Sequence, residues 1–426
     1  MKMQKALIGM MVMLLSVSAR ADNPAISNVT VTQRWPWSRL VDIDYVLDCD
    51  PGQTLDINVE AYDGSSRLAL PSGSLSGDLF NVPCGARRIT WDPTATDYAN
   101  DGVLCKFRVA LTATPVPLYM IVDLTKSAGE AGQTEYVYEE DLTNGLWGAW
   151  VRNPVTNKTT VIESVIWTGV TTNDVYKTAK LVLRRIPKGE PFEMGIAKIS
   201  TTLTKDFYVG VFEVTQRQWE LIMGYNPSNF KNASDYATRP LENASYDIMR
   251  GATNSVPAID WPWTGSLVLP SSFVGTLRAK TAFIDFDLPT EAQWEYACRS
   301  GTTTRYNDGL ADSSDDDLSK LGWWNGNSAV NDVVTTHSVG KKTPNAWGLY
   351  DMHGNVGEFC LNWSGPLEAL EGGEDPKGPE SGKERVFRGG YYRGYNYYCQ
   401  SHWSNTKREP WSASPFYGFR LVRTLP

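Results

Sequence analysis

Hydrophobic and polar residues alternate along the first quarter of the chain. Apolar side chains occupy every second position in residues 39–47, 54–61 and 103–111. A period of two is typical of β-strands that bury one face. Turn-forming Pro and Gly residues separate these stretches. The pattern predicts a small all-β, sandwich-like domain in residues 25–115.

The pattern weakens after this region and changes near Ala179. Residues 118–124 are strand-like, but residues 125–176 are rich in Gly, Thr, Asn and Glu and have no sustained period. We therefore assign residues 116–178 to a linker or irregular extension and residues 179–426 to a second domain. In this second domain the sequence predicts few helices, long loops and dense aromatic residues.

Two helices are predicted in the second domain because each begins with a capping box, a threonine followed three positions later by glutamine. The first begins at Thr215 and ends at Gly224, and the second begins at Thr290 and ends near Gly301. The acidic run at residues 315–317 has no glycine at the turn position of an EF-hand. We interpret it as a solvated loop.

The first 21 residues match a secretory signal peptide. Lys2 and Lys5 precede an apolar stretch at residues 6–17, and small residues follow at the positions that a signal peptidase reads. The apolar stretch is too short to cross a hydrocarbon layer of roughly 30 Å, which argues against a retained anchor. We expect cleavage of residues 1–21, a periplasmic or secreted mature protein, and no membrane span.

Charge and composition narrow the choice of partners. The formal net charge of the 426-residue chain is −8, and removing the three positive charges of residues 1–21 takes it to −11. An acidic chain of this size is a poor nucleic-acid binder. Only three histidines stand beside sixteen tryptophans. This leaves little room for a multi-histidine zinc site and suggests flat aromatic surfaces that hold a ligand.

The six cysteines fall into an early group and a late group of three. An exported chain permits disulfides, but three cysteines per group leave one unpaired in each unless the groups are cross-linked. No Cys-x-x-Cys occurs, which excludes thioredoxin-type redox chemistry and the common zinc ribbons. We interpret the early group as structural, with one disulfide in it. The early cysteines are Cys49, Cys84 and Cys105, and the late ones are Cys298, Cys360 and Cys399.

Five motifs in the second domain carry a resemblance. They are FYVGVFEVT at 207–215, LPTEAQWEYA at 288–297, NAWGLYDMHGNVGE at 345–358, RVFRGG at 385–390 and GFR at 418–420. In this order they resemble the sulfatase-modifying-factor family, whose founding activity is the formylglycine-generating enzyme. The resemblance implies an α+β fold, the C-type-lectin-like formylglycine-generating-enzyme fold with few helices and long loops. The β domain that precedes it lies outside the family's core.

The resemblance also identifies where the family's chemistry would be. In active members, two cysteines after the Arg-Gly-Gly motif bind copper(I) and, with oxygen, oxidise a substrate cysteine. Copper(I) favours a pair of soft thiolates. Counted forward from the motif, the two positions fall on Gly394 and Cys399, while counting backward from the last motif leaves Cys399 open. We therefore expect no copper, and Cys399 is only a weak catalytic candidate or a structural cysteine, buried or paired with Cys298 or Cys360.

Calcium is implied more directly, through backbone carbonyls and a few side-chain oxygens. The first implied site would use Asp351, Gly354, Val356 and Glu358. The second would use Asn327, Ser328, Asn331 and Val333. Asn331 stands where the family usually has an aspartate, which removes one negative charge from the second site. Each site has the alternative of a hydrogen-bonded turn without metal.

Aromatic residues are dense between Phe387 and Phe419, among Gly, Ser, Asn and Arg. Tyrosine with small neighbours is typical of paratope-like surfaces, because tyrosine offers a large contact area at low entropy cost. Lectin-type receptors that resemble this domain use the same segment as a variable ligand-binding face. The alternative is that these rings fill a loop-rich core. The candidate ligand-binding residues are Tyr391, Tyr392, Arg393, Tyr395, Tyr397, Tyr398, Trp403 and Trp411.

These observations favour an exported, non-catalytic member of the family that binds a protein, peptide or glycan through its aromatic C-terminal segment. The alternative is a formylglycine-generating oxidase that converts a sulfatase cysteine. A third possibility is that the β domain binds the ligand and the C-terminal domain is a scaffold.

Overall fold

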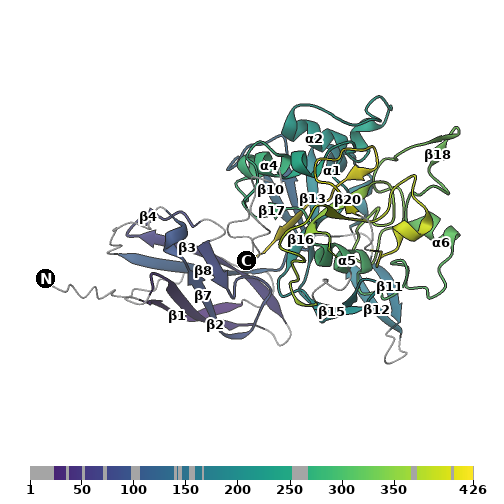
Figure 1. Ribbon diagram of the computed structural model, residues 1–426. Coiled ribbons are helices and arrows are strands. Elements are labelled where there is room, and N and C mark those ends of the chain that lie inside the picture. Colours follow the sequence, from purple (N-terminus) through teal and green to yellow (C-terminus); the bar gives the residue numbers. More distant parts are fainter. Residues whose placement is uncertain are drawn as a thin grey trace. The chain divides into compact units, whose positions relative to one another are not determined.

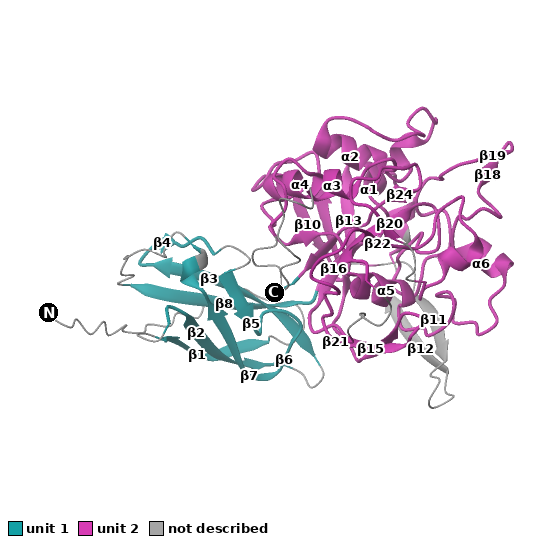
Figure 2. Ribbon diagram, in the orientation of Figure 1, with its two compact units in different colours: residues 1–116, 425–426 teal, residues 117–424 magenta. Residues whose placement is uncertain are grey.

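A computed structural model separates the chain into two compact units, Met1–Val116 with Leu425–Pro426 and Pro117–Thr424 (Figure 2). The structure describes residues 24–34, 38–49, 53–70, 74–96, 106–138, 142, 146–152, 159–165, 167–251, 267–365, 372–403 and 407–425. The expected signal peptide lies outside these residues. No helix in the described part is long and apolar enough to cross a membrane.

Unit 1 is an all-β domain of two sheets (Figure 1). One sheet has the strand order β1-β2-β7-β5, and the other has the order β4-β3-β6 with β8 paired to β3. All of these pairs are antiparallel. The strands are β1 Ala25–Gln33, β2 Val41–Asp48, β3 Thr54–Asp63, β4 Ser66–Arg67, β5 Leu75–Gly77, β6 Val82–Pro83, β7 Gly85–Trp91 and β8 Phe107–Pro115.

The alternating residues form the core of unit 1. Ile43, Tyr45 and Leu47 of β2 are buried and belong to one hydrophobic cluster with residues of both sheets. A disulfide joins Cys49 to Cys84. The prediction of one disulfide among the early cysteines is therefore confirmed, and Cys105 lies outside the described residues.

Unit 2 is built on a six-stranded sheet with the order β10-β9-β13-β16-β25-β17, accompanied by smaller sheets β23-β22-β20-β24 and β14-β15-β21. Two further pairs are β11-β12 and β18-β19. The strands are β9 Tyr119–Asp123, β10 Thr134–Val137, β11 Leu146–Arg152, β12 Thr159–Val165, β13 Lys180–Ile186, β14 Phe192–Met194, β15 Ile199–Thr202, β16 Phe207–Gly210, β17 Phe286–Asp287, β18 Ala329–Val330, β19 Val333–Val334, β20 Gly357–Trp363, β21 Gly373–Glu374, β22 Arg385–Arg388, β23 Lys407–Arg408, β24 Tyr417–Gly418 and β25 Val422–Thr424.

Short helices and long loops surround these sheets, as the α+β prediction requires. The α-helices of the described residues are α1 Val175–Thr178, α2 Gln216–Met223, α3 Tyr246–Met249, α4 Phe273–Thr281, α5 Glu291–Arg299 and α6 Asp315–Leu321. Both predicted helices are present with their capping boxes, at the N-caps Thr215 and Thr290. The prediction for residues 315–317 is wrong. They form the first turn of α6, because Ser314 caps the helix and carboxylates are favourable at a helix N-terminus.

The boundary of unit 2 also differs from the expectation. Strand β9 pairs with both β10 and β13, so residues 119–137 belong to the main sheet of unit 2. The linker assignment of residues 116–178 is therefore wrong for this part. The sequence signal was weak because strand β10 is short and its residues have no period-two pattern that marks a buried face.

Candidate ligand-binding site

Two buried arginines fix the C-terminal segment to the rest of unit 2. Arg388 of β22 forms an ion pair with Glu295 of α5, and its Nη2 donates to the carbonyl oxygen of Ser401 at 2.9 Å. Arg420 donates from Nη2 to Glu358 Oε1 of β20 at 2.8 Å. Because both guanidinium groups are buried and paired, the segment between them has fixed ends.

Between these anchors, six aromatic side chains form a continuous, partly exposed cluster that we call the aromatic face. Each ring contacts at least one other ring of the cluster. The distances between ring centroids are 5.8 Å for Tyr395–Tyr397, 4.3 Å for Tyr397–Tyr398, 6.0 Å for Tyr398–Trp403, 6.1 Å for Tyr391–Tyr398 and 4.9 Å for Tyr391–Phe416. A 3₁₀ turn at Asn396–Cys399 places three of these tyrosines at one end.

Two hydroxyl groups of the aromatic face have raised pKa values. A hydrogen bond between Tyr397 and Tyr398 raises the pKa of Tyr397 to about 12. Burial raises the pKa of Tyr391 as well. The face therefore offers stacking surfaces together with the Tyr391 and Tyr397 phenol groups, which can donate and accept hydrogen bonds.

The predicted ligand-binding residues are not all part of this face. Tyr392 is only 3% exposed and packs its ring on Phe230 and Phe416, so it is a core residue and the prediction is wrong for it. Trp411 is 62% exposed and, within the described residues, contacts no other ring. Arg393 is exposed. Phe416, which was not predicted as a ligand-binding residue, stacks on Tyr391.

Cys399 ends the 3₁₀ turn that carries Tyr397 and Tyr398, and it does not have the features of a reactive thiol. Its side chain is buried and unpaired, and its Sγ lies 3.9 Å from the carbonyl oxygen of Tyr395. Burial raises the pKa of the thiol to about 12, so it is protonated at neutral pH. With Gly394 at the other expected position, the residues present do not fit a copper(I) dithiolate site.

The other late cysteines are also buried and unpaired, so the alternative of a disulfide between Cys399 and Cys298 or Cys360 is not realised. Cys298 Sγ lies 3.9 Å from His353 Nε2. This histidine does not activate a thiol, because burial lowers its pKa to about 4, its Nδ1 contacts the carbonyl oxygen of Cys399 and its Nε2 accepts from the amide of Asn307. Burial raises the pKa of Cys298 to about 12.

The first implied calcium site fits a cation only in part. Asp351 is buried, its Oδ2 accepts from the amide of Gly340, and its Oδ1 has no hydrogen-bond partner in the described part of the chain. Burial raises the pKa of Asp351 to about 6. In contrast, the Glu358 carboxylate is already occupied, since it accepts from Trp294 Nε1 at 2.7 Å and pairs with Arg420. Gly354 and Val356 lie between them in the same buried loop.

The second implied site does not fit a cation. Asn327 uses its side chain to lock a turn, accepting from the amide of Trp324 and donating to the carbonyl oxygen of Gly322. The hydroxyl of Ser328 donates to the carbonyl oxygen of Tyr392. Asn331 and Val333 lie in or beside the exposed β18-β19 hairpin. The hydrogen-bonded turn, which was the alternative, accounts for these residues.

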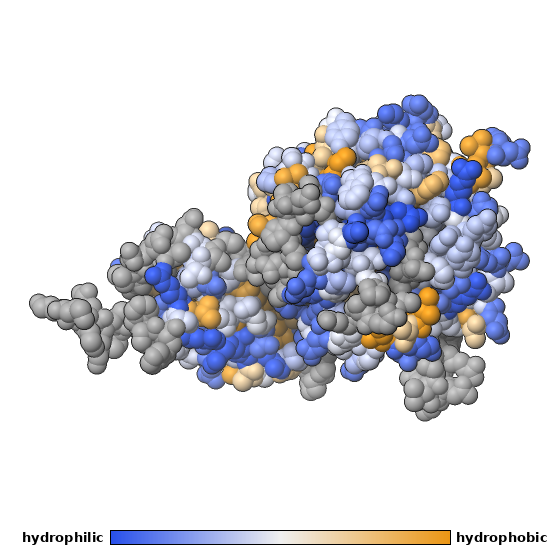
Figure 3. Space-filling model, in the orientation of Figure 1, coloured by the Kyte–Doolittle hydropathy of each residue, from blue (hydrophilic) through white to orange (hydrophobic). Residues whose placement is uncertain are grey.

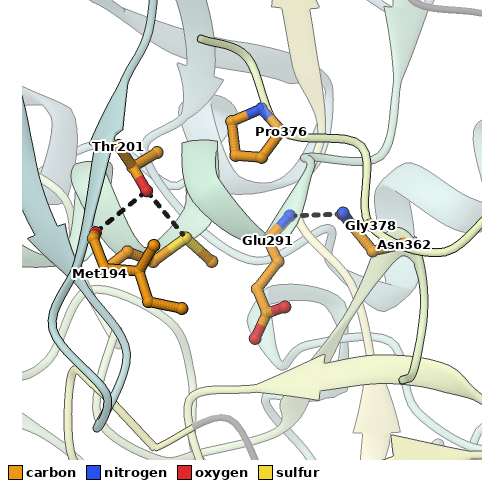
Figure 4. A pocket seen from close by; sticks show the side chains of 7 residues that line it. Met194, Thr201, Glu291, Asn362, Pro376 and Gly378 are labelled. Carbon is orange, nitrogen blue, oxygen red and sulfur yellow. Dashed lines mark hydrogen bonds between the residues drawn. The ribbon is translucent and has the colours of Figure 1, made fainter. Parts of the chain in front are cut away.

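A small cavity of about 10 Å³ is lined by Met194, Thr201, Glu291 and Asn362 among others (Figure 4). The amide of Glu291 donates to Asn362 Oδ1 at 2.7 Å. Glu291 Oε1 is buried and has no hydrogen-bond partner among the described residues. The cavity has room for about one water molecule and is too small for a larger ligand.

A second, larger pocket was missed by the sequence analysis. It has a volume of about 190 Å³ and is lined by Lys198, Arg299, Arg305 and His402, among others. These residues come from three separate segments of unit 2, so no local motif marks the pocket. On the face in Figure 3, hydrophobic residues form small separate spots rather than one large patch.

A family model, the sulfatase-modifying factor enzyme 1-like domain, matches residues 170–425 of this chain. Among curated proteins, the chain is 31% identical over 187 residues to a protein named chaperone protein LppX from Paenibacillus barcinonensis, which covers 39% of this chain and 65% of that protein. It is 37% identical over 149 residues to the formylglycine-generating enzyme of Streptomyces coelicolor, which covers 32% of this chain and 46% of that enzyme.

The matched parts thus span less than two thirds of either relative. Among solved structures, Treponema denticola variable protein 1 is 27% identical with a TM-score of 0.46, over 58% of this chain and 96% of that one.

Proposed function

Because this chain belongs to the family of sulfatase-modifying factor enzyme 1-like domains, we propose that it is an exported, non-catalytic member that binds a protein, peptide or glycan through the aromatic face. The family and the C-type-lectin-like α+β fold are shown by the match over residues 170–425 and by the few helices and long loops of unit 2. The ligand-binding role is the part that we propose.

The main support is the aromatic face itself. Its six rings are partly or largely exposed, yet they contact one another, and the segment that carries them is anchored by the buried ion pairs of Arg388 and Arg420. Rigid aromatic side chains bind with little loss of conformational entropy, which is why tyrosine and tryptophan dominate binding hot spots. A core that merely filled space would not leave Tyr395 58% exposed.

The second candidate is a formylglycine-generating oxidase, which is favoured by the 37% identity to an enzyme of that name. The residues at the two expected copper positions argue against an oxidase. The copper mechanism of the family's active members needs two thiolates, whereas Cys399 is a buried neutral thiol and the other expected position is Gly394.

Ligand binding is tested on printed peptide and glycan arrays with the mature chain. We expect some array ligands to bind the wild type. Their affinity for the Tyr395→Ser, Tyr397→Ser double variant should be at least tenfold lower, since hot-spot residues contribute about 2 kcal/mol or more each. Trp411→Ser is the matched control, because Trp411 is an exposed aromatic of the same segment outside the face. Equal loss in the control and the double variant would contradict the assignment.

The oxidase alternative is tested separately. Purified protein is incubated with copper(I), oxygen and a peptide that contains Cys-x-Pro-x-Arg, and the peptide mass is followed. We expect no change in mass with the wild type or with Cys399→Ser. Turnover that disappears in Cys399→Ser would replace the binding proposal with the oxidase.

Export rests on the residue pattern of the first 21 residues. Expression of the full chain with its N-terminus intact, followed by mass spectrometry of the extracytoplasmic fraction, should give a product that begins near Asp22. Recovery of only the uncleaved chain in the cytoplasm would contradict it.

A further inference from the structure

The 190 Å³ pocket beside α5 gathers polar side chains that the aromatic face does not use. It is lined by Lys198 from the loop between β14 and β15, by Arg299 at the end of α5, by Thr303 and Arg305 from the following loop, and by His402. His402 directly precedes Trp403 of the aromatic face, so the pocket and the face share one short turn, closed by a hydrogen bond from the amide of Trp403 to the carbonyl oxygen of Gln400.

Arg305 is the group of the pocket with unused hydrogen-bond donors. With the Gln400 amide oriented to satisfy both neighbours, its oxygen accepts from Arg305 Nε and Nη2 at 2.9 and 3.2 Å, and its nitrogen donates to His402 Nε2 at 3.0 Å. A guanidinium group has about five N–H donors, so roughly three remain for a ligand. Gln400 therefore orients the planar group without neutralising it.

Arg305 differs from the other two basic side chains of the pocket, which have carboxylate partners. Lys198 pairs at 3.5 Å with Glu193, which also lines the pocket, and Arg299 pairs at 2.8 Å with Glu295, which it shares with Arg388. No carboxylate in the described part of the chain forms an ion pair with Arg305, whose guanidinium lies 5.2 Å from the ring of Tyr306. A negatively charged ligand group would give Arg305 the partner that the protein does not supply.

The remaining polar groups are suited to the same kind of ligand. Because His402 Nε2 accepts from Gln400, the proton of the neutral ring lies on Nδ1, where it is a donor. Burial lowers the pKa of His402, and the positive charges of Arg299, Arg388 and Arg305 lower it further. The Thr303 hydroxyl at the exposed rim adds a donor.

We propose that this pocket is a binding site for an oxyanion with a single negative charge, a carboxylate group, held by the Arg305 guanidinium. Planar guanidinium groups bind carboxylates through paired, charge-assisted hydrogen bonds. The site is independent of the aromatic face and of the ligand proposed for it.

The experiment uses the three histidines of the chain as reporters. The full chain is labelled with ¹³C at the histidine Cε1 positions and titrated with N-acetylglycine, which carries one carboxylate, at constant ionic strength. We expect a saturable shift of the His402 signal, assigned with His402→Gln, and a rise in the pKa of His402 in the bound state. N-acetylglycinamide, which lacks the charge, should give no shift.

Arg305→Gln should weaken the titration at least fivefold, while Arg67→Gln in unit 1 should not change it, because Arg67 is exposed and distant in sequence. Unchanged signals of His337 and His353 show that Arg305→Gln is folded. The proposal is overturned if Arg305→Gln titrates like the wild type, or if sodium chloride reproduces the shift. Tighter binding of sulfate or phosphate than of N-acetylglycine would replace the carboxylate by a dianion and overturn the assignment.

Discussion

The two units differ in where they place their charges. In unit 1 the core is apolar, and ion pairs such as Arg88–Asp44 and Arg67–Glu60 lie at the surface, where both arginine side chains are more than half exposed. In unit 2, Arg388–Glu295, Arg420–Glu358 and Arg185–Asp206 are buried on both sides. In the sheets of unit 1, backbone N–H and C=O groups form hydrogen bonds with neighbouring strands. In the long loops of unit 2, these groups need side chains as hydrogen-bond partners.

Arg420 shows what the buried pairs do. Besides Glu358, its guanidinium donates to the carbonyl oxygens of Gly210 and Tyr350 at 2.7 and 2.8 Å. One side chain thus satisfies backbone groups of two segments that lie far apart in the sequence. Buried polar groups without partners cost free energy, so such arginines specify how loops pack. The comparison predicts that unit 2 is sensitive to single charges and unit 1 is not.

The largest expected effect is on the buried pair of Arg420. Arg420→Met should lower the free energy of unfolding of unit 2 by about 3–5 kcal/mol, because it leaves Glu358 buried without a cation. Glu213 and Asp351 lie in the same charge cluster and would lose the same cation. Chemical denaturation measures the change. If Arg420→Met does not fold, Arg420→Lys, which keeps the charge but loses the planar donors, should still show a lower midpoint.

The matched substitution in unit 1 is Arg67→Met, which removes the partner of Glu60 at the surface. It should change the stability of unit 1 by at most about 1 kcal/mol. Similar losses in the two variants would refute the distinction between the units.

Unit 1 should instead depend on its disulfide. The Cys49–Cys84 bond closes a loop with a sequence separation of 35 residues, and removing such a constraint costs about 2–4 kcal/mol in the chain-entropy model. Scanning calorimetry of Cys49→Ser, Cys84→Ser should show a lower transition for unit 1 and an unchanged one for unit 2. A shift of both transitions would show that the units do not unfold independently.

The same contrast explains what the sequence could predict. In unit 1, period-two alternation predicted β2 and β3, because one buried face is a local property of a strand. In unit 2, the capping boxes at Thr215 and Thr290 predicted two helices for the same reason. The partnership of β9 with β13 was missed, since it depends on pairing between distant strands rather than on local pattern.

For the candidate site, the sequence predicted which kinds of residue take part but not how they are arranged. The tyrosine-rich segment predicted an aromatic surface, and the structure brings Tyr391, Tyr397 and Tyr398 together on it. Nothing local distinguishes these from Tyr392, which follows Tyr391 in the chain but is buried. The pocket of Arg305 had no signal, because its groups meet only through tertiary packing.

A smaller effect is expected from the buried carboxylate of Glu291. Burial raises its pKa to about 7, while the unfolded value is near 4.5. The folded state therefore binds the proton more tightly, and the stability of unit 2 should fall as pH rises from about 4.5 through 7. In Glu291→Gln, the fall in unfolding free energy between pH 5 and pH 8 should be smaller than in the wild type by on the order of 2 kcal/mol. Unfolding free energies of both proteins at the two pH values measure the difference.

The control for Glu291→Gln is a carboxylate in unit 1 that is paired with an arginine at the surface. Glu291 lies 3.7 Å from Arg388, whose other partner is Glu295. Asp44 in unit 1 is a carboxylate paired with an exposed arginine, so Asp44→Asn should leave the pH dependence of unit 2 unchanged. Parallel pH profiles of wild type and Glu291→Gln would show that the carboxylate is ionised and compensated in the folded protein.

The smallest effect expected is that of calcium, which should change the stability of unit 2 and not that of unit 1. We propose that Asp351 Oδ1, buried and unpartnered in the described residues, takes a calcium ion together with carbonyl oxygens, while Glu358 stays with Arg420. At about ten times its Kd, calcium would add roughly 1.4 kcal/mol to the stability of unit 2. Calorimetry with calcium and with chelator should move only the unit 2 transition, and Asp351→Asn should abolish the difference. An equal shift with magnesium, or one that persists in Asp351→Asn, would place the effect elsewhere.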